Sequence, residues 1–135
     1  MKRDWSWSEV KTDAHAVLLR AAELIETFGW CQKILAKGEN GELFSVLSPT
    51  AAKFSLVGAI YRAGAEKHNL QCLDQTMNDA ARICVRRVLD RERQPIEYTA
   101  YPRIKDTIDG WNNVEGRTKE EVIAVLRDAA ALIAP

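Results

Sequence analysis

The chain has 135 residues, of which 47% are apolar and 28% charged, and its 19 basic side chains balance 19 acidic ones. This length and composition predict one soluble globular domain that buries its own core. The neutral charge argues against a general nucleic-acid-coating protein, which needs an excess of Lys and Arg, and no apolar run reaches the roughly 18 residues of a membrane span.

Apolar residues recur at three- and four-residue steps between Trp7 and Phe28, which predicts a first helix ended by Gly29. The segment Ser6–Glu9 matches a capping box at the start of this helix. The apolar stripe is too short for a sustained coiled coil, so it indicates one helix of a bundle.

The segment after this helix is less regular. Turn-forming residues at Lys37–Gly41 separate Cys31–Ala36 from Glu42–Val46. The two flanks fit either a short β-hairpin or a packed loop, and both interpretations stay open.

Ser48 before Pro49 is typical of a helix N-cap followed by proline, and it predicts a second helix over 49–67. Gly58 and Gly64 lie inside this helix, where each costs about 1 kcal/mol relative to alanine. We therefore expect a close helix contact, or a ligand against the backbone, at these glycines.

Apolar spacing predicts a third helix over 73–91 and a short one over 103–110. The last helix begins at a capping box, Thr118–Glu121, in which each of the two end residues can bond the other's backbone amide. Its apolar face runs over Val122–Ile133 at three- and four-residue steps.

Together these elements predict an all-α fold over residues 1–135. It is a single compact bundle of four main helices plus a short helix, with a small β-hairpin near 31–46 if that segment is not a loop. The expected core contains Val17, Leu24, Phe28, Phe54, Val57, Tyr61, Met77, Cys84, Val88, Trp111, Val122 and Leu126.

Four stretches carry a resemblance to known sequences. They are LLRAAELIETFGW at Leu18–Trp30, LSP at Leu47–Pro49, GAIYRA at Gly58–Ala63 and WNNVEGRTKEEV at Trp111–Val122. In this order they resemble a family of small uncharacterised proteins from bacteria and their phages, whose members often carry Cys at the position of Ser55. The family has no assigned activity, so the resemblance implies relatedness without chemistry.

Cys31, Cys72 and Cys84 are odd in number and have no metal-site spacing. We expect buried free thiols in a reducing cytoplasm, and the N-terminus has no signal-peptide pattern. No catalytic context surrounds Ser55, and two histidines do not build a usual zinc site. The sequence therefore favours a protein without catalytic residues, metal or cofactor.

The loop that begins at Trp111 is the first candidate site. The amides of Asn112 and Asn113 and the guanidinium of Arg117 are able to bind a ligand that stacks on Trp111. The favoured interpretation is structural, with Trp111 in the core and Arg117 paired with Glu121 or the chain end. We expect Asn112 to bond neighbouring backbone and Asn113 to be replaceable.

Arg82, Arg86 and Arg93 lie on one helical stripe, which is able to meet phosphate or an acidic partner. Asp79 and Asp90 stand at ion-pairing distance along the same helix. A solvated face with local ion pairs is therefore the favoured interpretation.

Two functions remain open. The first is a non-catalytic binding protein whose partner is another protein, as for a phage or prophage accessory protein that acts on a host protein, with Arg82, Arg86 and Arg117 as contacts. The alternative is a small-molecule-binding protein or enzyme with a pocket lined by Trp30, Tyr61, Arg62, Trp111, Asn112 and Arg117. A flat surface at this loop favours the first function and a concave polar cleft the second. The oligomeric state stays open.

Overall fold

The computed structural model describes residues 7–41, 45–66, 75–92 and 104–134. Over these residues it has five helices and two short strands: α1 (Trp7–Thr27), β1 (Ala36–Lys37), β2 (Lys53–Phe54), α2 (Leu56–Glu66), α3 (Gln75–Glu92), α4 (Ile104–Asn112) and α5 (Lys119–Leu132). The predicted all-α class, with four main helices and one short one, is confirmed. The capping box expected at Ser6 lies outside the described residues.

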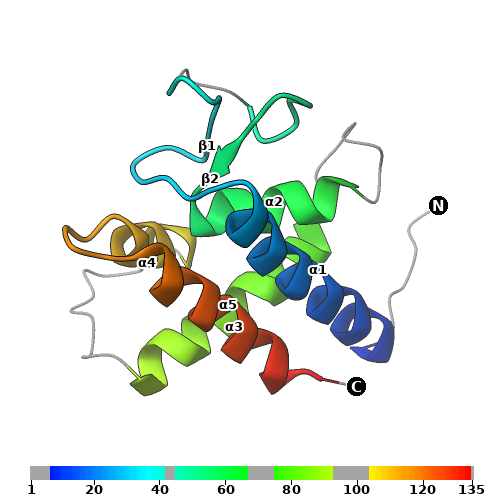
Figure 1. The fold of residues 1–135 in the computed structure, drawn as a ribbon. Coiled ribbons are helices and arrows are strands. Elements are labelled where there is room, and N and C mark those ends of the chain that lie inside the picture. The colour runs from blue at the N-terminus through cyan, green and yellow to red at the C-terminus, as the bar shows by residue number, and fades with distance from the viewer. Residues whose placement is uncertain (1–6, 42–44, 67–74, 93–103, 135) are drawn as a thin grey trace.

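Helix α1 packs against α5, α2 and α3, while α3 also packs against α4 and α5. Figure 1 shows the small sheet at one end of the bundle, next to α2, and α3 running from beside α2 toward the opposite end. None of the helices in the described ranges is long and apolar enough to cross a membrane.

Most of the expected core residues are buried. The confirmed members are Val17, Leu24, Phe54, Val57, Tyr61, Cys84, Val88, Trp111, Val122 and Leu126. The expectation for Phe28 is wrong, because this side chain is 56% exposed. Helix α1 ends at Thr27, so the helical spacing that placed Phe28 on the face of Leu24 stops before it. The side chain of Met77 lies outside the described residues.

The two strands form an antiparallel pair, with Ala36 opposite Phe54 and Lys37 opposite Lys53. The small β element is confirmed, and β1 lies in the expected segment, but its partner is β2 and not Glu42–Val46. The backbone of Phe54 also bonds Gly29 and Cys31, at 3.1 and 3.0 Å. This pairing places the Phe54 ring in the core, where it is 1% exposed.

Helix α2 begins at Leu56, seven residues later than the Ser48-Pro49 pattern predicts. The hydroxyl of Ser48 accepts from the Thr50 amide at 3.3 Å and closes only a turn. The N-cap of α2 is instead Ser55, whose hydroxyl accepts from the Gly58 amide at 3.0 Å. The later start leaves Lys53 and Phe54 free to pair with β1.

Gly58 lies where the chain before β1 crosses α2. A Cβ atom on Gly58 would stand 1.9 Å from the backbone carbonyl oxygen of Leu35. Only glycine permits this approach, so the close contact expected at Gly58 is confirmed and its partner is backbone.

Candidate functional site

The loop between α4 and α5 lies against the segment that follows α1. The side-chain amide of Gln32 donates to the backbone carbonyls of Asn112 and Val114, both at 3.0 Å. Figure 1 shows the two segments, cyan and orange, on the same side of the molecule. A lone Gln in a loop carries no sequence signal, and Gln32 was not among the expected site residues.

Asn112 is the centre of this contact and is fully buried. Its Oδ1 accepts from the indole Nε1 of Trp30 at 2.7 Å and from the amide of Leu56 at 3.1 Å. Its Nδ2 donates to the carbonyl of Cys31 at 3.2 Å. The expectation that Asn112 bonds neighbouring backbone is confirmed, and its amide joins α4, the start of α2 and the segment after α1.

Asn113 is exposed but is not free. Its Oδ1 accepts from the backbone amide of Lys33 at 2.7 Å and from Nδ2 of Asn112 at 3.2 Å. Lys33 has a φ of 75°, an uncommon backbone conformation for a residue other than glycine. Asn113 therefore helps to hold a strained position, and its expected replaceability stays a prediction.

The side chain of Arg117 packs back against the loop that precedes α5. Its guanidinium lies 4.0 Å from the centre of the Trp111 ring, and its Nε donates to the Trp111 carbonyl at 3.0 Å. Its Nη1 also pairs with Glu121 at 3.0 Å. The Glu121 pKa is lowered chiefly by the hydrogen bond from the Thr118 amide, with Arg117 adding to it. The predicted capping box of Thr118 and Glu121 is confirmed.

Tyr61 and Arg82 meet between α2 and α3, away from this loop. Arg82 Nη1 donates to the Tyr61 hydroxyl at 2.9 Å, and Arg86 Nη1 donates to the Thr107 hydroxyl at 3.3 Å. Each arginine also pairs with an aspartate of its own helix, and the side chains are only 14% and 16% exposed. The expected local ion pairs with Asp79 and Asp90 are confirmed. The interpretation as a solvated face is wrong, because both arginines also bond neighbouring helices. Arg93 lies outside the described residues.

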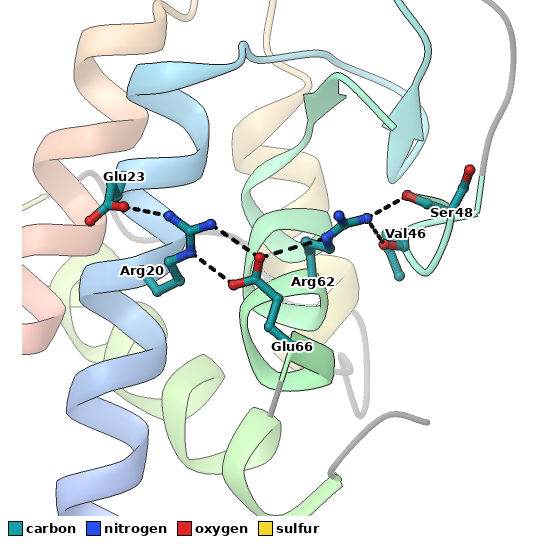
Figure 2. A network of polar contacts seen from close by, with 6 residues as sticks. All are labelled: Arg20, Glu23, Val46, Ser48, Arg62 and Glu66. Carbon is teal, nitrogen blue, oxygen red and sulfur yellow. Dashed lines mark hydrogen bonds and ion pairs between the residues drawn. The ribbon is translucent and has the colours of Figure 1, made fainter. Parts of the chain in front are cut away.

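Arg62 belongs to a different network, which Figure 2 shows. Its Nη1 donates to the backbone carbonyls of Val46 and Ser48, the first at 3.0 Å. Its guanidinium lies 5.8 Å from the Phe54 ring centre and 3.9 Å from the carboxylate of Glu66. Arg62 thus fastens the chain between the strands to α2.

Glu66 also accepts two hydrogen bonds from Arg20 of α1. Arg20 Nε donates to Oε1 at 2.8 Å, and Nη2 donates to Oε2 at 3.1 Å. The hydrogen bond that Arg20 donates to Glu66 is the main reason that the Arg20 pKa is raised. These two residues stand 46 positions apart, so no local pattern could have paired them. A shallow groove of about 250 Å³ beside the pair is lined by Ala16, Val17, Arg20, Ala63 and Glu66.

A small cleft of about 90 Å³ lies beside the Trp111 loop. It is lined by Lys33, Ile34, Leu35, Ser55, Asp109 and Asn113. Of the pocket residues expected from sequence, the structure joins Trp30, Trp111, Asn112 and Arg117 around the loop, whereas Tyr61 and Arg62 lie in the two other networks. Only Asn113 among the candidate residues lines the cleft.

The described residues hold no group of three His, Cys, Asp or Glu side chains placed to bind a metal ion. Cys31 and Cys84 are buried free thiols. Burial raises the pKa of Cys31 to about 11 and raises that of Cys84 as well. Both sulfurs are therefore protonated near neutral pH, which makes them poor nucleophiles.

The sequence model of a family of unknown function (DUF6197) matches residues 9–132 of the chain. The chain therefore belongs to this family. No curated protein and no solved structure matches it.

Proposed function

We propose that this member of the family is a non-catalytic interaction protein whose partner is another protein. The observation that carries the proposal is a pair of exposed apolar side chains on two segments that are fixed to each other. Phe28 is 56% exposed and Val114 is 47% exposed. Gln32, four residues after Phe28, donates to the carbonyl of Val114 itself.

The rigidity of this region supports a binding role. The hydrogen bonds of Gln32, Asn112, Asn113 and Arg117 hold both backbones in one conformation. A surface that is already ordered loses little conformational entropy when a partner docks. Exposed large apolar groups on such a surface then gain from burial against the partner.

The polar site residues also fit this proposal. The guanidinium groups of Arg82, Arg86 and Arg117 donate hydrogen bonds to other residues of the same chain. We therefore propose that they support the surface and do not contact the partner. The origin implied by the family resemblance, a phage or prophage accessory protein acting on a host protein, is part of the same proposal. So is a cytoplasmic location, which the buried free thiols Cys31 and Cys84 favour.

The experiment compares two double variants of the tagged protein expressed in a bacterial cytoplasm. Phe28→Ser with Val114→Ser removes the apolar pair, and Ile83→Ser with Leu132→Ser removes two other exposed apolar groups as a matched control. We expect a specific partner protein to be retained by the parent and by the control and lost by the first variant, with equal melting temperatures. Retention by the Phe28 and Val114 variant would contradict the proposed surface.

A second candidate function is binding of a small molecule at the same loop, and the 90 Å³ cleft favours it. Its lining includes the carboxylate of Asp109, the side-chain amide of Asn113 and the hydroxyl of Ser55, which also caps α2. The volume is that of a few water molecules, so it suits one polar group of a ligand. Ligand-observed NMR with small polar fragments tests this, and binding that is lost in Asp109→Ala supports it.

A further inference from the structure

The contact between α2 and α3 contains a buried amide without a hydrogen bond. Asn78 on α3 is fully buried, and neither Oδ1 nor Nδ2 of its side chain has a hydrogen-bond partner within the described part of the chain. The amide is pressed against Gly64 of α2, where an added Cβ would stand 2.5 Å from the Asn78 Oδ1. A buried polar group in this state is destabilising, because folding removes its water and supplies no replacement.

A second polar group at this contact is in the same state. The Nε of Arg82, one turn after Asn78, is buried and has no hydrogen-bond partner among the described residues. The same guanidinium reaches the Tyr61 hydroxyl of α2 through Nη1. The contact thus combines one satisfied polar pair with three buried polar atoms that have no hydrogen-bond partner among the described residues.

Helix α3 packs less extensively against α2 than against α1 and α5. Among the described side chains, α3 buries Ala81, Cys84, Val85, Val88 and Leu89, and α1 buries Ala14, Val17, Leu18, Ala21, Ala22, Leu24 and Ile25. The bond from Arg86 to Thr107 of α4 is polar and 3.3 Å long. Water can replace this bond and the Arg82–Tyr61 bond when the helix moves away.

We propose that α3 separates from α2 in a local opening that precedes global unfolding, and that the unsatisfied amide of Asn78 drives this opening. In the open state water hydrates the amide and Arg82 Nε, so opening requires less free energy than it would at an apolar contact. Opening also uncovers the face of α2 that carries Tyr61 and Gly64. The inference is independent of the proposed function.

The experiment uses two buried thiols as reporters in a Cys72→Ser background. Cys84 lies on α3, and Cys31 lies in the segment after α1. The rate at which each thiol reacts with the disulfide reagent DTNB, without denaturant, measures how often its surroundings open. We expect Cys84 to react faster than Cys31 in the parent. Equal rates would mean that only global unfolding exposes the two thiols, which overturns the proposal.

The variant Asn78→Ala removes the unsatisfied amide. We expect it to slow the reaction of Cys84 by about tenfold, the size associated with one unsatisfied buried group, and to leave Cys31 unchanged. An unchanged or faster Cys84 reaction would show that the amide does not drive opening and would overturn the proposal.

A variant at the facing position gives a matched control. Gly64→Ala places a Cβ 2.5 Å from the Asn78 Oδ1, so it should speed the reaction of Cys84 in the parent. In the Asn78→Ala background the same substitution meets no amide and should have little effect. If Gly64→Ala alone does not fold and the double variant with Asn78→Ala does, the difference in folding itself shows that the two positions contact each other. An equal effect in both backgrounds contradicts the assigned contact.

Discussion

Trp30 and Asn112 stand 82 positions apart and are joined by a 2.7 Å hydrogen bond from the indole Nε1 to the side-chain Oδ1. The same oxygen accepts a hydrogen bond from the backbone amide of Leu56, the first residue of α2. The Asn112 Nδ2 donates a hydrogen bond to the carbonyl of Cys31. A single fully buried amide therefore fixes three separate segments of the chain. Any ligand or partner at the Trp111 loop meets a backbone that this amide has already ordered.

We predict that Asn112→Ala destabilises the protein by about 3 kcal/mol, because the Trp30 indole, the Leu56 amide and the Cys31 carbonyl each lose a hydrogen bond, at about 1 kcal/mol or more each. Asn113→Ala should cost about 1 kcal/mol, since it releases only the backbone of Lys33 and the side chain of Asn112. Urea unfolding of both variants measures the difference. Two variants that both unfold like the parent would rule out the structural role of the pair.

The close approach at Gly58 gives a second prediction. Gly58→Ala should destabilise by at least about 2 kcal/mol, because the carbonyl of Leu35 is backbone and cannot rotate away from the added Cβ. Gly110→Ala is the matched control within α4, where an added Cβ has open space. The control should stabilise by about 0.5–1 kcal/mol, since alanine favours the helix. Thermal melts decide, and a neutral Gly58→Ala would contradict the observed approach.

The two arginines that meet Glu66 should differ in their effect on stability. Arg62→Ala should cost about 2 kcal/mol, because the Arg62 side chain is 12% exposed and holds two backbone carbonyls. Arg20→Ala should cost less than about 1 kcal/mol, since that side chain is 37% exposed and water screens its pair. Arg127→Ala, in an exposed pair with Glu26, serves as the control with almost no change. The reverse order in chemical denaturation would mean that Arg62 does not fasten the segment between the strands.

The features that sequence analysis identified correctly are local ones. The capping box at Thr118 needs only four consecutive residues, and both of its hydrogen bonds are present. The start of α2 was predicted wrongly because Ser48 and Ser55 are both reasonable N-caps on local grounds. The choice between them depends on Phe54, which pairs with Ala36 and fills the core. That pairing joins residues 18 positions apart, and no local pattern contains it.

The same distinction between local contacts and contacts between distant residues applies to the candidate site. The stacking of Arg117 on Trp111 joins two ends of one loop, and sequence analysis named both residues. The partners of Arg82 and Arg86 on α2 and α4 lie 21 positions away in each case, so the stripe looked like a solvated face. A helical wheel gives the direction of a side chain, whereas its burial depends on which neighbouring helix covers that direction.

The capping box supplies a pH-dependent prediction at Glu121. The pKa of this carboxyl is lowered from its ordinary value of 4.5, first by the Thr118 amide and then by Arg117. A group whose pKa is lower in the folded state stabilises the fold above its unfolded pKa, and this contribution is lost as the pH falls through the folded pKa.

The parent should therefore be more stable than Glu121→Gln near pH 7, and the difference should shrink below about pH 4.5. Urea unfolding of both proteins at pH 7, 5, 4 and 3 measures it. Glu120→Gln is the matched control, since Glu120 shares the first turn of α5 but is not part of the capping box. A Glu121→Gln difference that persists undiminished at pH 3 would mean that the ionised carboxylate does not stabilise the start of α5.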